Sequence, residues 1–390
     1  MEPVDTQSGQ TRLPVRFTGS GSEYFRIWIV NLLLTLVTFG LYHPWAKVRK
    51  LRYFYGNTLV GEHALDFHGN PKRMLRGFVL VGALLAAYSV AGRLSPAAGM
   101  AAVLILAAVW PALFRAAMQF RLANTSWRGL RFHFSGNLTG AYRALLPLFV
   151  PAALFMILAQ WASQAPKAGT PAWLSAAMAA SQIAAVALLP LTWWSVKRYQ
   201  HDHYLFGSVQ TQLRAGVGTF YGVFLKTLLA GLLAVVVCGA VIVGAATLLG
   251  MDALRHATAR RSADFGVWIA LGGLAFVLGY VALIVLGQSF FASRMQNLLW
   301  NRTKSGDVRF ESRLGARPML VLTLKNWLLT LLTLGLYWPF AAVATARMKL
   351  QAVTVYTRAD PGHIVERARR LSGDASGDAA ADLFGIDVGL

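Results

Sequence analysis

The sequence has few charged side chains and only one thiol. Of its 390 residues, 14% are charged and 56% are hydrophobic, and the one cysteine, Cys238, lies in a long apolar run. A single cysteine excludes a disulfide framework and a metal site built from several thiolates. Soluble domains usually carry about 25% charged residues. The composition therefore indicates a polytopic membrane protein rather than two or three soluble domains.

Charge is also missing from particular places in the chain. Six internal segments contain no Asp, Glu, Lys or Arg, and a helix needs roughly 17 to 25 apolar residues to cross the hydrocarbon core. These segments are residues 77–92, 94–114, 144–166, 168–196, 227–251 and 265–293. The sequence therefore predicts six spanning helices, and the first can be extended by Arg76 and Arg93 reaching outward to the two interfaces. Because none contains an Asp, Glu, Lys or Arg, the sequence argues against a proton-driven pump built on buried carboxylates.

The motifs of several enzyme classes are absent as well. There is no Gly-Lys-Ser/Thr phosphate loop and no Gly-x-Ser-x-Gly element, although the chain has 36 glycines. His201, Asp202 and His203 form the one metal-like cluster, but adjacent residues on a turn rarely converge on one ion. Glu62, Asp66 and the nearby histidines are explained by alternation along a strand. We therefore predict no metal, no cofactor and no enzymatic activity.

The charges that are present are unevenly distributed. The formal net charge is +21, and four connections between apolar segments hold 23 Lys and Arg residues, whereas three other loops hold 5. The four basic connections are residues 47–76, 115–143, 197–226 and 294–325. By the positive-inside rule, these connections are expected in the cytoplasm.

Each basic connection also contains a short alternating stretch bounded by glycines. These stretches are residues 61–69, 129–136, 207–216 and 306–315, and a fifth lies at residues 15–18. Alternation with period two predicts short strands or hairpins. They are expected outside the hydrocarbon core, because an open sheet edge is unstable in lipid. One small sheet and separate hairpins are both compatible with the pattern.

The two ends of the chain contain nearly the same segment. Residues 31–46 recur as residues 326–341, with 11 of 16 positions identical and no gap, which indicates duplication of a structural unit. Each copy has a polar stripe on one helical face and a Gly-Leu-Tyr-x-Pro element that should break the helix. The residues singled out as a broken-helix repeat are Asn31, Thr35, Gly40, Tyr42 and Pro44 in the first copy and Asn326, Thr330, Gly335, Tyr337 and Pro339 in the second.

These terminal copies leave two topologies open. Counted as full spans they give eight helices, but each copy follows a Val-Arg-Phe strand, and the second strand lies in a basic connection. If the two copies lie on the same side of the membrane, both termini are in the cytoplasm. This arrangement favours six spans plus two re-entrant or interfacial helices. Paired broken helices are typical of transport sites, although kinked spans that pack along small polar residues give the same pattern.

A basic and aromatic segment follows the first copy. It contains Lys47, Arg49, Lys50, Arg52 and Tyr53. Such clusters attract anionic lipid headgroups, at about 1 kcal/mol per charge near the surface, and aromatic rings anchor at the interface. A site for an anionic solute is the alternative. Nucleic acid is not an expected partner, because no nucleic-acid-binding fold accompanies the charge.

The predicted fold class is an all-α polytopic membrane protein with six to eight transmembrane or re-entrant helices and short β-hairpins in the cytoplasmic connections. The predicted organisation is an N-terminal tail over residues 1–12, a membrane domain over residues 13–356 and a C-terminal tail over residues 357–390. Within the membrane domain, the repeat copies occupy residues 13–55 and 306–350. The last segment is polar and rich in Gly and Ala, so we expect it to be disordered.

Three of these features together carry a resemblance. They are the run Asn-Leu-Leu-Leu-Thr-x-x-Thr-x-Gly-Leu-Tyr-x-Pro-Trp from Asn31, the basic residues 47–53, and Phe132-x-Phe-x-Gly136. The chain resembles the YjgN type of bacterial inner-membrane protein over about residues 17–348. The resemblance implies a multi-pass protein of the bacterial inner membrane and supplies no catalytic or binding residues. The second copy departs from the first where Ala342 and Ala344 replace Lys47 and Arg49.

The expected function is transport-like or channel-like, without a proton-relay site. The alternative is a membrane scaffold or a lipid-interacting factor that acts through a basic cytoplasmic face. In either case the expected partner is the bilayer, with its anionic headgroups.

Overall fold

A computed structural model describes residues 4–5, 10–164, 170–248, 263–306, 308–358, 360–363 and 365–366. The chain divides into two compact units. The first contains residues 1–220, 299–312 and 339–390, and the second contains residues 221–298 and 313–338. Most of the predicted C-terminal tail, from residue 367 onward, lies outside the described residues.

Helices account for most of the described chain. In order they are α1 (Gly21–Val37), α2 (His43–Gly56), α3 (Pro71–Leu94), α4 (Pro96–Ala123), α5 (Leu138–Ser163), α6 (Ala172–Ala187), α7 (Leu189–His201), α8 (Val217–Leu248), α10 (Ala263–Arg302), α11 (Ala316–Leu332) and α12 (Trp338–Gln351).

Among the described residues, four helices are long and apolar enough to cross a membrane: α3, most of α4, α5 and residues 217–241 of α8. The pair α6 and α7 adds a fifth if it is one span bent by 43°. Pro190 lies in the first turn of α7, so the bend falls where the sequence predicts a kink. These four or five candidate spans are fewer than the predicted six to eight.

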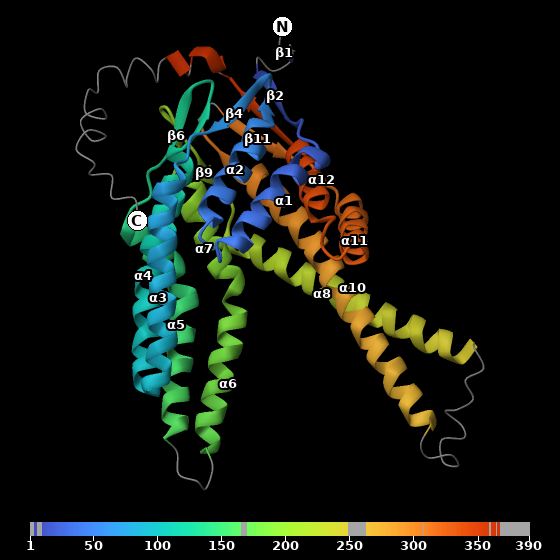
Figure 1. Cartoon of the computed structure of the whole chain (residues 1–390). Helices are drawn as coiled ribbons and strands as arrows, with labels where there is room; N and C mark the ends of the chain where they lie inside the picture. The colour runs from blue at the N-terminus through green and yellow to red at the C-terminus, as the bar shows by residue number, and fades with distance from the viewer. Residues whose placement is uncertain are drawn as a thin grey trace. The chain divides into compact units, whose positions relative to one another are not determined.

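The described chain is mostly helical, as predicted, but the all-α class holds only in part, because the short strands join into one sheet. The strands are β1 (Val4–Asp5), β2 (Gln10–Phe17), β3 (Thr58–Val60), β4 (His63–Phe67), β5 (Thr125–Trp127), β6 (Leu130–Phe134), β7 (Tyr204–Phe206), β8 (Val209–Gln210), β9 (Gln212–Leu213), β10 (Thr303–Lys304), β11 (Val308–Ser312) and β12 (Val353–Thr357). Their order is β8-β7-β6-β5-β4-β3-β2-β12-β11-β10-β9, and β1 pairs with β2. Within the first unit, the strands gather at one end of helices α3 to α6 (Figure 1).

The two ends of this strand order are neighbours in the chain. β8 pairs with β7, β9 pairs with β10, and Thr211 alone separates β8 from β9. The Thr211 amide donates to the carbonyl of Tyr204, so the bend itself is hydrogen-bonded. An unpaired edge is a template for aggregation, and this sheet leaves little of one.

Three of the hairpins turn through two residues. Val60 pairs with His63, Trp127 with Leu130 and Phe206 with Val209. Each two-residue loop contains a glycine with positive φ: Gly61, Gly129 or Gly207. Such loops match the twist of the flanking strands only when φ is positive, which explains the glycines seen in the sequence.

The exits from the sheet into the following helices share one local arrangement. Five times, a helix side chain donates a hydrogen bond to the carbonyl two residues beyond the strand. Four of the donors lie on the helix that precedes the strand, and Arg347 lies on α12, far along the chain from β2. The pairs are Arg347 to Gly19 (2.8 Å), Arg52 to Gly69 (3.5 Å), Arg115 to Gly136 (2.8 Å), Trp194 to Ala215 (2.8 Å) and Asn297 to Leu314 (2.9 Å). These carbonyls lie in extended linkers, where no ladder or helix would satisfy them.

Three of these exits also share the sequence Phe-x-Gly followed by a capping residue. Ser20, Asn70 and Asn137 cap α1, α3 and α5, each accepting a bond from a backbone amide of the first turn. The preceding phenylalanine ring lies against the glycine. At Gly136, an added Cβ would overlap both the Phe134 ring and the Tyr199 hydroxyl. Phe134 and Tyr199 belong to a buried cluster with Ala141 and Ala144.

This close approach predicts a position-specific cost for adding one methyl group. Gly136→Ala should lower the free energy of unfolding by about 1 to 3 kcal/mol, because the new Cβ overpacks the cluster. Gly82→Ala is the control, since nothing lies within 4 Å of its Cβ position in α3. It should be neutral or stabilising by roughly 0.5 to 1 kcal/mol, because alanine is the better helix former. Intrinsic tryptophan fluorescence during thermal unfolding in detergent measures both, and equal effects would contradict the packing argument.

Candidate functional site

The first terminal copy folds as an antiparallel pair of helices. The Tyr53 hydroxyl donates to the carbonyl of Ser20 at 2.8 Å, and the rings of Tyr24 and Tyr53 stack at 5.4 Å. Further along, Asn31 Nδ2 donates to the carbonyl of Ala46 at 3.5 Å. The start of α1 therefore lies beside the end of α2, and residues 27–46 do not form one helix. The eight-span alternative requires a continuous helix here, whereas the re-entrant alternative requires this reversal.

The reversal occurs where the Gly-Leu-Tyr-x-Pro element predicts a break. Phe39 has φ of 50° and Gly40 has φ of 90°, and the Tyr42 amide donates to Thr38 Oγ1 at 3.0 Å. Pro44 then occupies the first turn of α2, where a missing N–H costs nothing. The second copy has the same turn. Leu334 has φ of 49° and Gly335 has φ of 93°. The Tyr337 amide donates to Thr333 Oγ1 at 2.9 Å, and Pro339 lies in the first turn of α12.

The polar stripe of each copy is largely satisfied by its own helix. Thr35 donates to the carbonyl of Asn31 at 2.6 Å, and Thr38 donates to that of Leu34 at 2.7 Å. In the second copy, Thr333 donates to the carbonyl of Leu329 at 2.7 Å, and the carbonyl of Thr330 accepts from the Gly335 amide at 2.7 Å. Asn31 and Asn326 are both buried. The stripe therefore holds the turn together, and few of its donors face outward.

The two turns carry unusually exposed apolar side chains at their tips. Phe39 is 98% exposed and Leu334 is 94% exposed. The flanking exposed residues are also apolar: Leu36, Val37, Leu41, Leu331, Leu332 and Leu336. From Arg26, the last charged residue of α1, to Thr38 is 12 residues, or about 18 Å of helix. That is a little more than half of a hydrocarbon core of about 30 Å.

The basic segment of α2 is divided between two faces of the helix. Arg49, Arg52 and Tyr53 line one open groove of about 680 Å³ with Arg26, Ile27 and Val30 of α1. Lys47 lies on another side, where it lines a cavity with α3 and α4. Residues two apart on a helix point in nearly opposite directions, so the sequence cluster cannot act as one surface.

The groove has one acidic neighbour, and its charge is already engaged. The Tyr53 hydroxyl donates to Glu23 Oε2 at 3.1 Å, and this bond, together with those from Ser20, lowers the pKa of the Glu23 carboxyl. On the far side of α2, burial and the neighbouring Lys47 lower the pKa of Lys50. Arg26 and Arg49 are exposed. The groove therefore presents cationic groups beside the apolar hairpin.

The metal-like cluster does not assemble. His201 Nδ1 hydrogen-bonds Thr303 Oγ1 at 2.8 Å, His203 Nδ1 hydrogen-bonds the carbonyl of Tyr199 at 2.8 Å, and Asp202 pairs with Arg198 at 3.3 Å. Three different partners hold three neighbouring side chains apart. Within the described chain, no group of three His, Cys, Asp or Glu residues is placed to hold a metal ion.

Comparison with known proteins agrees with a membrane location. The chain is 30% identical over 145 residues to the inner membrane protein YjgN of Salmonella typhimurium strain LT2, covering 36% of this chain and 37% of that protein. It is 32% identical over 131 residues to the YjgN of Escherichia coli O157:H7, covering 32% of each. These alignments span about a third of the length of the curated relatives. No solved structure matches.

The sheet strands from Arg12 onward, the apolar helices and the two terminal repeat copies all lie within one family match. The model of bacterial proteins of unknown function (DUF898) covers residues 12–383. The chain therefore belongs to this family of bacterial proteins, and its curated relatives are inner membrane proteins.

Proposed function

We propose that this inner-membrane protein binds anionic lipid through the hairpin formed by α1 and α2. The observation that carries the proposal is the pair of apolar tips, Phe39 and Leu334, which are almost fully exposed. Large apolar side chains with positive φ are uncommon, because the left-handed conformation is strained for them. Gly or Asn would relieve the strain in water. A bilayer offers the one solvent in which Phe and Leu at these tips are favourable.

The length and charge of the hairpin support the same placement. Its apolar part reaches about 18 Å beyond Arg26, which is too short to cross the core and long enough to reach its middle. Arg26 and Arg49 then lie near the headgroups, where each basic residue contributes about 1 kcal/mol toward anionic lipid. We place the basic connections and both chain termini in the cytoplasm by the same charge rule.

Transport is the second candidate, and one observation favours it. Asn31 Oδ1 is buried without a hydrogen-bond partner among the described residues, about two helical turns before the helix break. A buried polar oxygen at a broken helix is the kind of group that contacts ions or solutes in transporters. We also infer that the two terminal copies arose by duplication, as transporter repeats do. Solute or ion flux in proteoliposomes that falls with Asn31→Leu would support transport over lipid binding alone.

Tip depth provides a direct test of lipid insertion. In a Cys238→Ala background, a fluorophore attached to Phe39→Cys or Leu334→Cys should be quenched severalfold more by lipids spin-labelled deep in the acyl chain than by aqueous iodide. A fluorophore at Ser22→Cys, at the base of the hairpin, is the control and should show the reverse order. Iodide quenching of the tips equal to that of the base would disprove insertion.

The basic groove makes a separate prediction about headgroup preference. Energy transfer from the Ser22→Cys fluorophore to headgroup-labelled lipid should be stronger for phosphatidylglycerol than for phosphatidylcholine. Arg26→Gln and Arg49→Gln should each reduce this preference about fivefold, since each removes about 1 kcal/mol of attraction. Arg93→Gln, at the opposite end of α3, should not change it. High salt should weaken the preference, because exposed charges are screened.

A further inference from the structure

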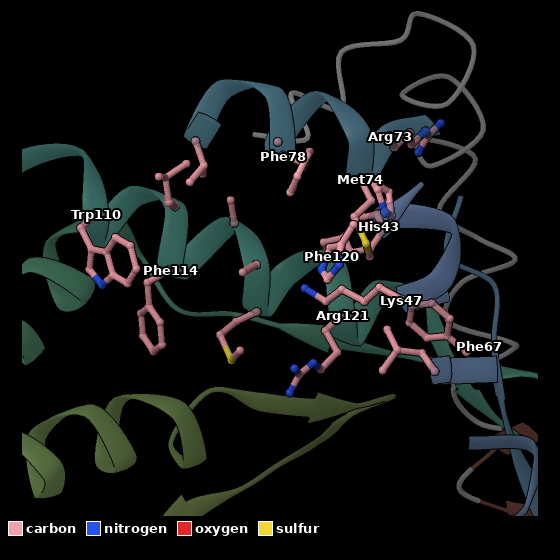
Figure 2. A pocket seen from close by; sticks show the side chains of 18 residues that line it. His43, Lys47, Phe67, Arg73, Met74, Phe78, Trp110, Phe114, Phe120 and Arg121 are labelled. Atoms are coloured by element: carbon pink, nitrogen blue, oxygen red, sulfur yellow. The ribbon is translucent and has the colours of Figure 1, made fainter. Parts of the chain in front are cut away.

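A second site lies on the other side of α2, in the first unit. It is a cavity of about 490 Å³ between α2, α3, α4 and the end of β4, within the size range of ligand pockets. Figure 2 shows Trp110 and Phe114 at one end of this cavity and Lys47, Arg121 and His43 toward the other. The cavity thus has an apolar end and a cationic end.

The apolar part runs along the two candidate spans. Trp110 precedes Arg121 by 11 residues on α4, and Val81 follows Arg73 by 8 residues on α3. These separations correspond to about 16 Å and about 12 Å along the helices. α3 has no buried residue, and Phe78 and Trp110 are 41% and 49% exposed. An acyl chain could therefore enter between α3 and α4 without displacing a packed core.

None of the residues that line the cavity is acidic. Eighteen residues line the cavity, and the formally charged ones among them are Lys47, Arg73 and Arg121. In the described part of the chain, neither Lys47 nor Arg121 forms an ion pair. Tyr204 lies near Arg121, but burial raises its pKa to about 12, so at neutral pH it is no counter-ion. Cationic side chains that line one cavity, with no carboxylate among the lining residues, are typical of an anion site.

The geometry points to a site for one anionic phospholipid drawn from the bilayer. We propose that an acyl chain lies along Val81, Trp110 and Phe114, and that the phosphate contacts Lys47, Arg73 and Arg121. A free inorganic anion would leave the larger apolar part unfilled. The proposal shares with the proposed function only a chain placed in a bilayer that contains anionic lipid, and it does not depend on the groove of Arg26 and Arg49.

Native mass spectrometry of the full chain with added phosphatidylglycerol tests the site. We expect one retained lipid per chain, held at least about tenfold more tightly than phosphatidylcholine, because the quaternary ammonium of choline brings a positive charge beside the cationic lining and glycerol does not. The combined change Lys47→Gln, Arg73→Gln and Arg121→Gln should abolish this retention. Arg76→Gln, one turn beyond Arg73 and outside the lining, is the matched control and should keep the lipid.

A filling variant keeps the test decisive if the charge variant fails to fold. Ala117 lines the cavity and is exposed, so Ala117→Trp fills space without disturbing a packed core. It should prevent lipid retention, whereas Ala101→Trp, exposed on the same helix, should not. Retention by both the charge and the filling variants would overturn the proposal. So would inorganic phosphate that competes as well as the phospholipid, because that outcome assigns a free-anion site.

The outcomes also separate this site from the hairpin surface. Arg26→Gln with Arg49→Gln should abolish the surface preference for phosphatidylglycerol and leave the retained lipid in place. If the surface preference is absent in the unmodified chain while one lipid is retained, the surface proposal fails and the cavity proposal stands. If no lipid is retained while the preference persists, the cavity proposal fails alone.

Discussion

Where the chain passes from a strand into an apolar helix, the backbone polar groups of the linker need hydrogen-bond partners that neither the sheet nor the helix supplies. A carbonyl in such a linker costs as much as a lost hydrogen bond if it is buried without a donor. Five side chains, from arginine, tryptophan and asparagine, provide that donor at five exits. The donor group differs among the five exits, but the acceptor is always the carbonyl two residues beyond the strand. Each helix that follows a strand therefore begins at a fixed point, and the positions of the hairpin and the cavity follow from those starting points.

Much of the local structure could be predicted from the sequence. The glycine-bounded alternating stretches became β4, β6, β8, β9 and β11, and the Gly-Leu-Tyr-x-Pro elements became the turns before α2 and α12. What alternation cannot give is the pairing partner, so the sequence left one sheet and separate hairpins equally possible. It also gave no place to β12, although Val353–Thr357 is rich in β-branched residues and would have supported a strand. β2 begins at Gln10, inside the segment assigned to an N-terminal tail.

The candidate sites show a different limit. The basic segment after the first copy reads as a single cluster in sequence, but the rotation of 100° per residue directs Arg49 and Arg52 into the groove and Lys47 into the cavity. Helical periodicity alone could have shown this division. The partners of Lys47 could not have been found in this way, because Arg73 and Arg121 come from two further helices. Likewise, His201, Asp202 and His203 are adjacent in sequence but do not form one site, since each side chain has a different partner: Thr303, Arg198 and the carbonyl of Tyr199.

The seam between β2 and β12 bears on how such a chain is made. Val355 pairs with Leu13, so about 340 residues must be synthesised between the two partners. At about 5 to 20 residues per second, the first strand waits on the order of 17 to 70 s for its neighbour. During that interval the edge of β2 that β12 will occupy is open to pairing with a wrong strand, so this edge must stay unpaired until the last strand emerges from the ribosome.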